Sequence, residues 1–177
     1  TLYGAEFDVK KHFQLGEEGF FAARRLVLVG NYTFTKSKLK VAPGDQVAVF
    51  GAFSTAASDY FTNGAKLTGQ SDHIVNFEVG LENQDKLSQQ TLMITYASDR
   101  VVSRGVFGSP PQPDVYERPG LRVDFVAREG FTLLGKELEL KFEARNLTGR
   151  GHVEFQQSGK NRLEVNSYEV GGTFSLS

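Results

Sequence analysis

Charged side chains at alternate positions are the first candidates for chemistry in this 177-residue chain. The clearest stretch, Lys136 to Arg145, reads K-E-L-E-L-K-F-E-A-R. Carboxylates held side by side can perform general acid–base catalysis. We favour a plainer interpretation, a salt-linked surface that meets water, because charges this dense require one side of a strand to be wet. The residues predicted to share this wet face are Glu78, Asp99, Arg122, Asp124, Glu137, Glu139, Lys141, Glu143 and Arg145.

Aromatic and arginine side chains gather in and beside two long predicted loops. Their rings and guanidinium groups can stack on and hydrogen-bond a sugar or an anionic chelate. Packing of the loops on themselves is the alternative use of the same side chains. The candidate ligand-binding residues are Tyr60, Phe61, Arg100, Arg104 and Tyr116, with Phe50 and Phe53 close to the first two in sequence.

No catalytic motif accompanies these residues. His12, His73 and His152 lie in or beside different connections, without the i,i+2 or i,i+4 spacing typical of metal ligands. The chain has no nucleophile with a nearby base and no phosphate-binding loop. The sequence therefore predicts a protein that is not an enzyme, with no catalytic residue, no metal and no cofactor.

The elements that position these side chains are segments in which apolar and polar residues alternate. In the stretch from Lys136 to Arg145, four apolar residues fall on one side and the charges on the other, which is the period of a half-buried strand. Ten residues exceeds the usual strand length of about five or six, and is about the length that a tilted strand needs to cross a bilayer. The alternating segments are 1–13, 24–41, 73–83, 89–101, 120–128, 136–145 and 166–177.

This pattern predicts an all-β fold, an antiparallel up-and-down meander of about seven long strands. The predicted connections alternate in length: those at about 14–23, 83–86 and 129–135 are short, and those at about 42–72, 102–119 and 147–165 are long. In a meander, every second connection lies at the same end, so the long loops share one end. Outer-membrane barrels show this asymmetry. The loop at 102–119 is too rich in proline to pair as a central strand.

The amino-acid composition limits which binding partners and which kinds of site we expect. The net charge is −1 with no basic tract, so nucleic acid is not an expected partner. The absence of cysteine excludes disulfides and thiolate metal sites. No apolar run approaches the roughly 18 residues of a transmembrane helix. The mean hydropathy of −0.30 still allows a membrane strand, because alternating strands look soluble on average.

Several segments resemble the C-terminal part of the barrel of TonB-dependent outer-membrane receptors. The segments that carry the resemblance are P-P-Q-P-D-V-Y-E-R-P-G-L-R-V-D-F (110–125), K-F-E-A-R-N-L-T-G-R (141–150) and N-S-Y-E-V-G-G-T-F-S-L-S (166–177). The segments 3–11, 31–39 and 67–73 also look similar to that family's later strands. The resemblance implies a transmembrane β-barrel in the bacterial outer membrane that imports a scarce nutrient, such as a siderophore or an oligosaccharide. The implied partners are the rest of the barrel, a plug domain, TonB acting through that plug, membrane lipid and the nutrient.

Two departures from the family indicate a partial barrel. The chain carries no counterpart of the plug or of the TonB-engaging motif, and it ends at Ser177 without the usual terminal aromatic residue. It also opens in a strand pattern without a signal peptide. We therefore expect residues 1–177 to be a C-terminal segment of the barrel that does not transport by itself. Its two outer strands would pair with missing strands or, edge to edge, with a second copy, or the segment would refold into a more closed shape.

A small soluble β-barrel that binds an apolar ligand inside it is the alternative. It would enclose Phe125, Leu140 and Phe142 and turn Glu139 and Lys141 outward. The side of the strands that meets water therefore separates the two hypotheses.

Overall fold

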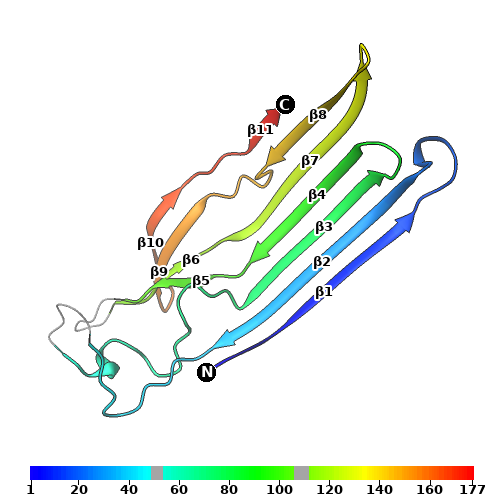
Figure 1. Cartoon of the computed structure of the whole chain (residues 1–177). Coiled ribbons are helices and arrows are strands. Elements are labelled where there is room, and N and C mark those ends of the chain that lie inside the picture. Colours follow the sequence, from blue (N-terminus) through cyan, green and yellow to red (C-terminus); the bar gives the residue numbers. More distant parts are fainter. Residues whose placement is uncertain (49–53, 106–111) are drawn as a thin grey trace.

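A computed structural model describes residues 1–48, 54–105 and 112–177, and its main feature is an open antiparallel sheet of seven strands (Figure 1). Every pair of neighbouring strands is antiparallel, in the order β1-β2-β3-β4-β7-β8-β11. The predicted all-β meander of seven strands is therefore confirmed. The strands are β1 (Leu2–Gln14), β2 (Arg24–Ser37), β3 (His73–Asn83), β4 (Ser88–Ala97), β7 (Gly120–Leu133), β8 (Lys136–Arg145) and β11 (Thr173–Leu176).

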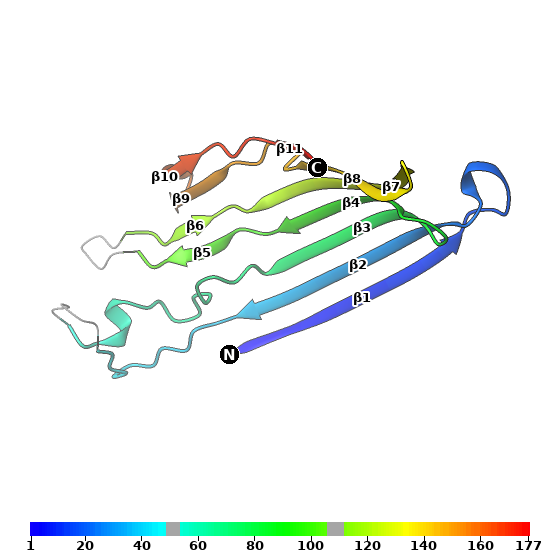
Figure 2. The ribbon, with the colours of Figure 1, turned by 45° about the horizontal axis from the view of Figure 1, so that its top comes forward.

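A second sheet of four strands continues one end of the first. Its order is β10-β9-β6-β5, and the chain passes from β4 to β5, from β6 to β7, from β8 to β9 and from β10 to β11. The strands β5, β6, β9 and β10 therefore lie side by side in the same order as β4, β7, β8 and β11. Figure 2 shows β5 and β6 lying beyond the ends of β4 and β7. The strands are β5 (Arg100–Ser103), β6 (Val115–Glu117), β9 (His152–Ser158) and β10 (Asn161–Tyr168).

These four strands correct three predictions. The segment 147–165 is not a loop, because it holds β9 and the first part of β10. The segment 166–177 is not one strand, because it is interrupted between Tyr168 and Thr173. The proline-rich segment 102–119 does contain a central strand, since β6 pairs with both β5 and β9. Pro113 and Pro119 flank β6 without entering it, so all three residues of that strand keep their backbone donors.

The short and long connections lie at opposite ends of the seven-stranded sheet, as Figure 1 shows. The connection predicted at 129–135 is wrong in extent, because β7 runs on to Leu133 and only Leu134 and Gly135 form the turn. Both have positive φ, 52° and 74°, as a two-residue hairpin of the type that matches strand twist requires. Two short 3-10 helices, η1 (Gly19–Phe21) and η2 (Ala57–Asp59), lie in the other connections.

The register aligns all the apolar faces of the seven strands on one side of the sheet. Ile94 lies opposite Phe77 on β3 and opposite Val123 on β7. Its neighbour Met93 lies opposite Glu78 and Asp124, so the other side is polar. Because strand side chains alternate, this register continues across the sheet.

The apolar face is open to its surroundings. Leu140 is 46% exposed and Phe142 is 37% exposed. Among the described residues, the buried hydrophobic side chains are only Val27, Ala57, Val101, Ala144 and Phe155. The sheet therefore does not close around an apolar centre. The described part of the chain contains no helix long and apolar enough to cross a membrane.

Candidate functional site

The most elaborate side-chain chemistry lies where the two sheets meet. Four strands of the large sheet are each separated from a strand of the small sheet by a short break in the chain. The breaks lie at residues 98–99, 118–119, 146–151 and 169–172. The breaks are brought together because the two sheets have the same strand order. A hollow of about 390 Å³ lies at this junction, and the side chains around it include Asn76, Thr95, Arg118, Arg122, His152 and Tyr168.

Asn146 ties two of these breaks together. Its side-chain amide donates to the carbonyl of Arg150 at 3.1 Å and to the carbonyl of Val170. Its Oδ1 accepts the backbone N–H of Arg150 at 3.0 Å, and its own N–H donates to Asp124 Oδ1 at 2.6 Å. The residue is 4% exposed and has φ of 54°, a conformation that asparagine tolerates better than most residues. Asn146 therefore connects the break after β8 with the break before β11.

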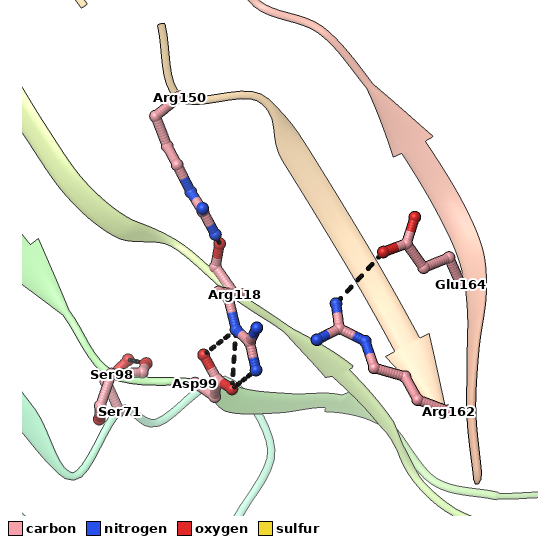
Figure 3. Close-up of polar contacts among 7 residues, drawn as sticks. All are labelled: Ser71, Ser98, Asp99, Arg118, Arg150, Arg162 and Glu164. Carbon is pink, nitrogen blue, oxygen red and sulfur yellow. Dashed lines mark hydrogen bonds and ion pairs between the residues drawn. The ribbon is translucent and has the colours of Figure 1, made fainter. Parts of the chain in front are cut away.

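Arg150 connects the same region to the start of β7. Its guanidinium donates through Nε to the carbonyl of Pro119 at 3.0 Å and through NH2 to the carbonyl of Arg118 at 2.6 Å. Figure 3 shows the side chain extended toward the backbone of Arg118. Gly120 has φ of 69°, and a Cβ there would lie 2.9 Å from Arg150 Nε. The positive φ and the close approach of Arg150 both favour a glycine at position 120.

Arg118 and Asp99 form the third connection, between the breaks of β4–β5 and β6–β7. The Arg118 guanidinium donates to both carboxylate oxygens of Asp99, at 2.9 to 3.2 Å (Figure 3). This hydrogen bonding raises the pKa of Arg118 above its ordinary value, so the group stays charged. Arg118 also lies over the ring of Phe155, at 5.0 Å, and Arg162 lies over the same ring at 4.0 Å.

The long loop before β3 is joined to this junction through serine. The Ser71 hydroxyl donates to the carbonyl of Ser98 at 2.7 Å, a contact that Figure 3 also shows. The Ser98 hydroxyl in turn accepts the backbone N–H of His73 at 3.1 Å. The start of β3 is thus fixed against the end of β4.

Two of the predicted ligand-binding residues, Arg100 and Tyr116, belong to the four-stranded sheet, and Arg104 directly follows its strand β5. Arg100 pairs with Glu117 at 2.7 Å, and Arg104 pairs with Asp114 at 2.6 Å. Arg104 also donates to the carbonyl of Lys66 in the first long loop. The ring of Tyr116 stacks on Phe155 with 5.8 Å between the ring centres. Both arginines are thus already neutralised by carboxylates of this chain.

The other two predicted residues lie in the loop between β2 and β3. The Tyr60 hydroxyl donates to the carbonyl of Ser54 at 2.7 Å. Phe61 lines a separate hollow of about 270 Å³ together with Leu39 and Ala57. Phe50 and Phe53, which the sequence placed beside them, lie outside the described residues.

The histidines make local contacts. His73 Nδ1 lies 2.9 Å from the Tyr32 hydroxyl, and the ring of His152 stacks on Tyr168 with 4.8 Å between centres. His152 also lies 3.1 Å from a carboxylate oxygen of Glu154. Within residues 1–48, 54–105 and 112–177, no group of three histidine, aspartate or glutamate side chains is arranged to hold a metal ion.

Sequence reasoning named none of the central junction residues as a candidate binding group. In the sequence, Asn146 and Arg150 belong to a segment that resembles the receptor family, and Arg122 is predicted only to lie on the wet face of the strands. Their proximity depends on strand order rather than on local spacing. Comparisons of the chain with protein-family models, with curated proteins and with solved structures found no match. The function must therefore be argued from geometry.

Proposed function

We propose that this chain is part of the wall of a TonB-dependent receptor barrel in the bacterial outer membrane, which imports a scarce nutrient such as a siderophore or an oligosaccharide. The observation that carries the proposal is the open apolar face of the seven-stranded sheet, backed by a charged face. In this arrangement lipid covers the first face and a water-filled lumen meets the second.

The extent of the apolar face supports a lipid contact. It includes Phe7 (64% exposed) on β1 and Phe174 (68% exposed) on β11, the two outer strands. A water-soluble monomer rarely exposes a continuous apolar patch larger than a few hundred Å². Six of the seven strands have 10 to 14 residues, and a tilted transmembrane strand needs about 9 to 11.

The polar face supports a watery lumen. Arg128 pairs with Glu139 at 2.6 Å, and Glu143 pairs with Lys141 at 3.2 Å and with Arg145 at 2.7 Å. Exposed pairs of this kind add little stability, and they keep a strand wall wettable. In the complete receptor this face would meet the plug, through which TonB would supply energy.

The open edges support a larger assembly. β1 and β11 are the outer strands of the sheet. An exposed strand of 13 residues such as β1 is a template for further pairing. The remaining strands of the barrel would satisfy both edges; a second copy of this chain is the alternative partner.

The absence of cysteine makes a direct test simple. Single substitutions Met93→Cys and Ile94→Cys would each carry a spin label in the chain reconstituted into lipid vesicles. We expect the label at 94 to collide with dissolved oxygen, which concentrates in lipid, and the label at 93 to collide with a water-soluble nickel complex. Labels at both positions that meet only water would refute the proposal. A label at 94 shielded from both reagents would instead favour the soluble barrel with an apolar ligand inside.

A further inference from the structure

The lining of the hollow at the sheet junction includes three arginines, Arg118, Arg122 and Arg150, and one carboxylate, Glu117. Arg118 is paired with Asp99, and Glu117 is paired with Arg100. Arg122 lines the same hollow, is exposed, and has no ion pair or hydrogen-bond partner for its side chain among the described residues. Arg150 contacts only backbone carbonyls with its guanidinium. Within the part of the chain that the structure describes, no carboxylate pairs with either of these two guanidinium groups.

Two further acidic side chains of this region have other contacts. Asp124, two residues from Arg122 on β7, accepts the backbone N–H of Asn146 at 2.6 Å. Glu154, beside the hollow, lies 3.1 Å from His152. A planar guanidinium without a partner is a good receptor for a carboxylate, because it can donate two parallel hydrogen bonds.

Flat and hydrogen-bonding side chains complete the lining. Tyr168 and His152 stack at 4.8 Å and form a platform on which a ring can lie. Asn76 and Thr95 add neutral polar groups from β3 and β4. A volume of about 390 Å³ is within the range of small-molecule sites, near its lower end.

We infer that this hollow binds a small acid that carries a ring, with Arg122 contacting the carboxylate and the Tyr168–His152 platform contacting the ring. The ring belongs either to a sugar acid or to an aromatic acid, which share this chemistry. One part of the inference rests on the proposed function: if the chain belongs to a receptor, the nutrient that the receptor imports is an acidic compound. Binding itself requires only the folded junction.

Calorimetric titration of the 177-residue chain in a polyoxyethylene detergent, which contains no sugar, tests the inference. The probes are two matched pairs, glucuronate with glucose and 4-hydroxybenzoate with phenol. We expect one of the two acids to bind. The affinity of its neutral counterpart should be lower by roughly tenfold or more, because a hydrogen bond to a charged group is lost. The acid that binds identifies the kind of ring.

Substitutions on one strand provide the control. Arg122→Gln should weaken binding of the acid by roughly tenfold, and Arg122→Lys should weaken it less, because the charge remains. Arg128→Gln changes an arginine on the same face of β7 that pairs with Glu139 outside the hollow, and it should leave the affinity unchanged. Circular dichroism would verify that all three variants fold.

Three results would overturn the inference: neither acid binds, the neutral compounds bind as well as the acids, or Arg122→Gln and Arg128→Gln have equal effects. The spin-label experiment separates this outcome from failure of the proposed function. Insertion into vesicles without acid binding refutes the acidic ligand alone. Acid binding by a chain whose labels meet only water refutes the receptor and retains the site.

Discussion

The two sheets of this protein share one strand order but are stabilised differently. In the seven-stranded sheet the strands pair without a register shift, and its two faces differ sharply in polarity. In the four-stranded sheet the register shifts at Val101/Ser103 and at Glu164/Asn166. The smaller sheet buries Val101 (1% exposed) and Phe155 (4% exposed), which form a small core of their own.

The proposed location in a membrane would account for this difference. A sheet between two different solvents must keep a strict alternation, because a slip of one residue moves every side chain to the wrong face. In the smaller sheet, which has register shifts, an ion pair joins Arg100 and Glu117 and the rings of Tyr116 and Phe155 stack. The junction between them is where side-chain hydrogen bonds replace the interrupted backbone ladder.

The largest expected effect tests the two faces directly. In lipid vesicles, Ile94→Arg should lower the free energy of unfolding by about 2–4 kcal/mol, since it places a charge on the lipid side. Met93→Arg, one residue away, should change it little, because Met93 lies between Glu78 and Asp124. Urea titration followed by heat-dependent gel mobility measures both. Equal losses would mean that the faces do not meet different solvents.

The next effect tests whether the junction depends on Asn146. Asn146→Ala should cost about 1–3 kcal/mol, because the carbonyls of Arg150 and Val170 lose a part-buried donor. Hydrogen exchange should accelerate at the Arg150 amide, which donates to Asn146 Oδ1. The matched control is Asn161→Ala, at the exposed start of β10, and we expect it to have no effect on that amide. Unchanged exchange at Arg150 in the first variant would contradict the role of Asn146.

A smaller effect is expected from the backbone at the start of β7. Gly120→Ala should cost about 1–2 kcal/mol, because a side chain is unfavourable at φ of 69° and would press on Arg150. Gly171→Ala is the control, because a Cβ at 171 would meet nothing within 4 Å. Thermal unfolding of the two variants measures the difference. If both variants unfold alike, the approach of Arg150 is not what requires the glycine.

The smallest expected effect concerns the pair of Arg118 and Asp99. Their side chains are 40% and 37% exposed, so a double-mutant cycle with Arg118→Gln and Asp99→Asn should give a coupling of about 0.2–1 kcal/mol. The coupling should fall as salt is added, because exposed charges are screened. A coupling that is large and insensitive to salt would show that the junction excludes water.

The meander was predictable because its signal is local. Alternation appears within each segment, and Leu138, Leu140 and Phe142 are enough to mark the apolar side of β8. The meander order was predicted from the succession of alternating segments, and the lengths of the connections predicted which loops share an end. The strands of the second sheet were missed for two reasons. β6 has three residues, too few to show a period, and β9 was absorbed into a loop although Val153 and Phe155 alternate in it.

The candidate site was mostly beyond prediction. The aromatic and arginine residues singled out from the sequence are divided between the loop of Phe61 and the sheet of Arg100. The junction instead joins residues as far apart in the chain as Asp99, Arg118 and Arg150. No spacing along the chain reveals such a group.

The sequence by itself determined which side chains share a face, since a strand repeats every two residues and needs no distant contact to do so. Only the tertiary structure decided that the strands of the two sheets are interrupted at the same level. It also decided that Arg122 faces a hollow there with no acidic partner among the described residues. The reason is physical: alternation is a property of one strand, whereas a site at a junction depends on which strands become neighbours.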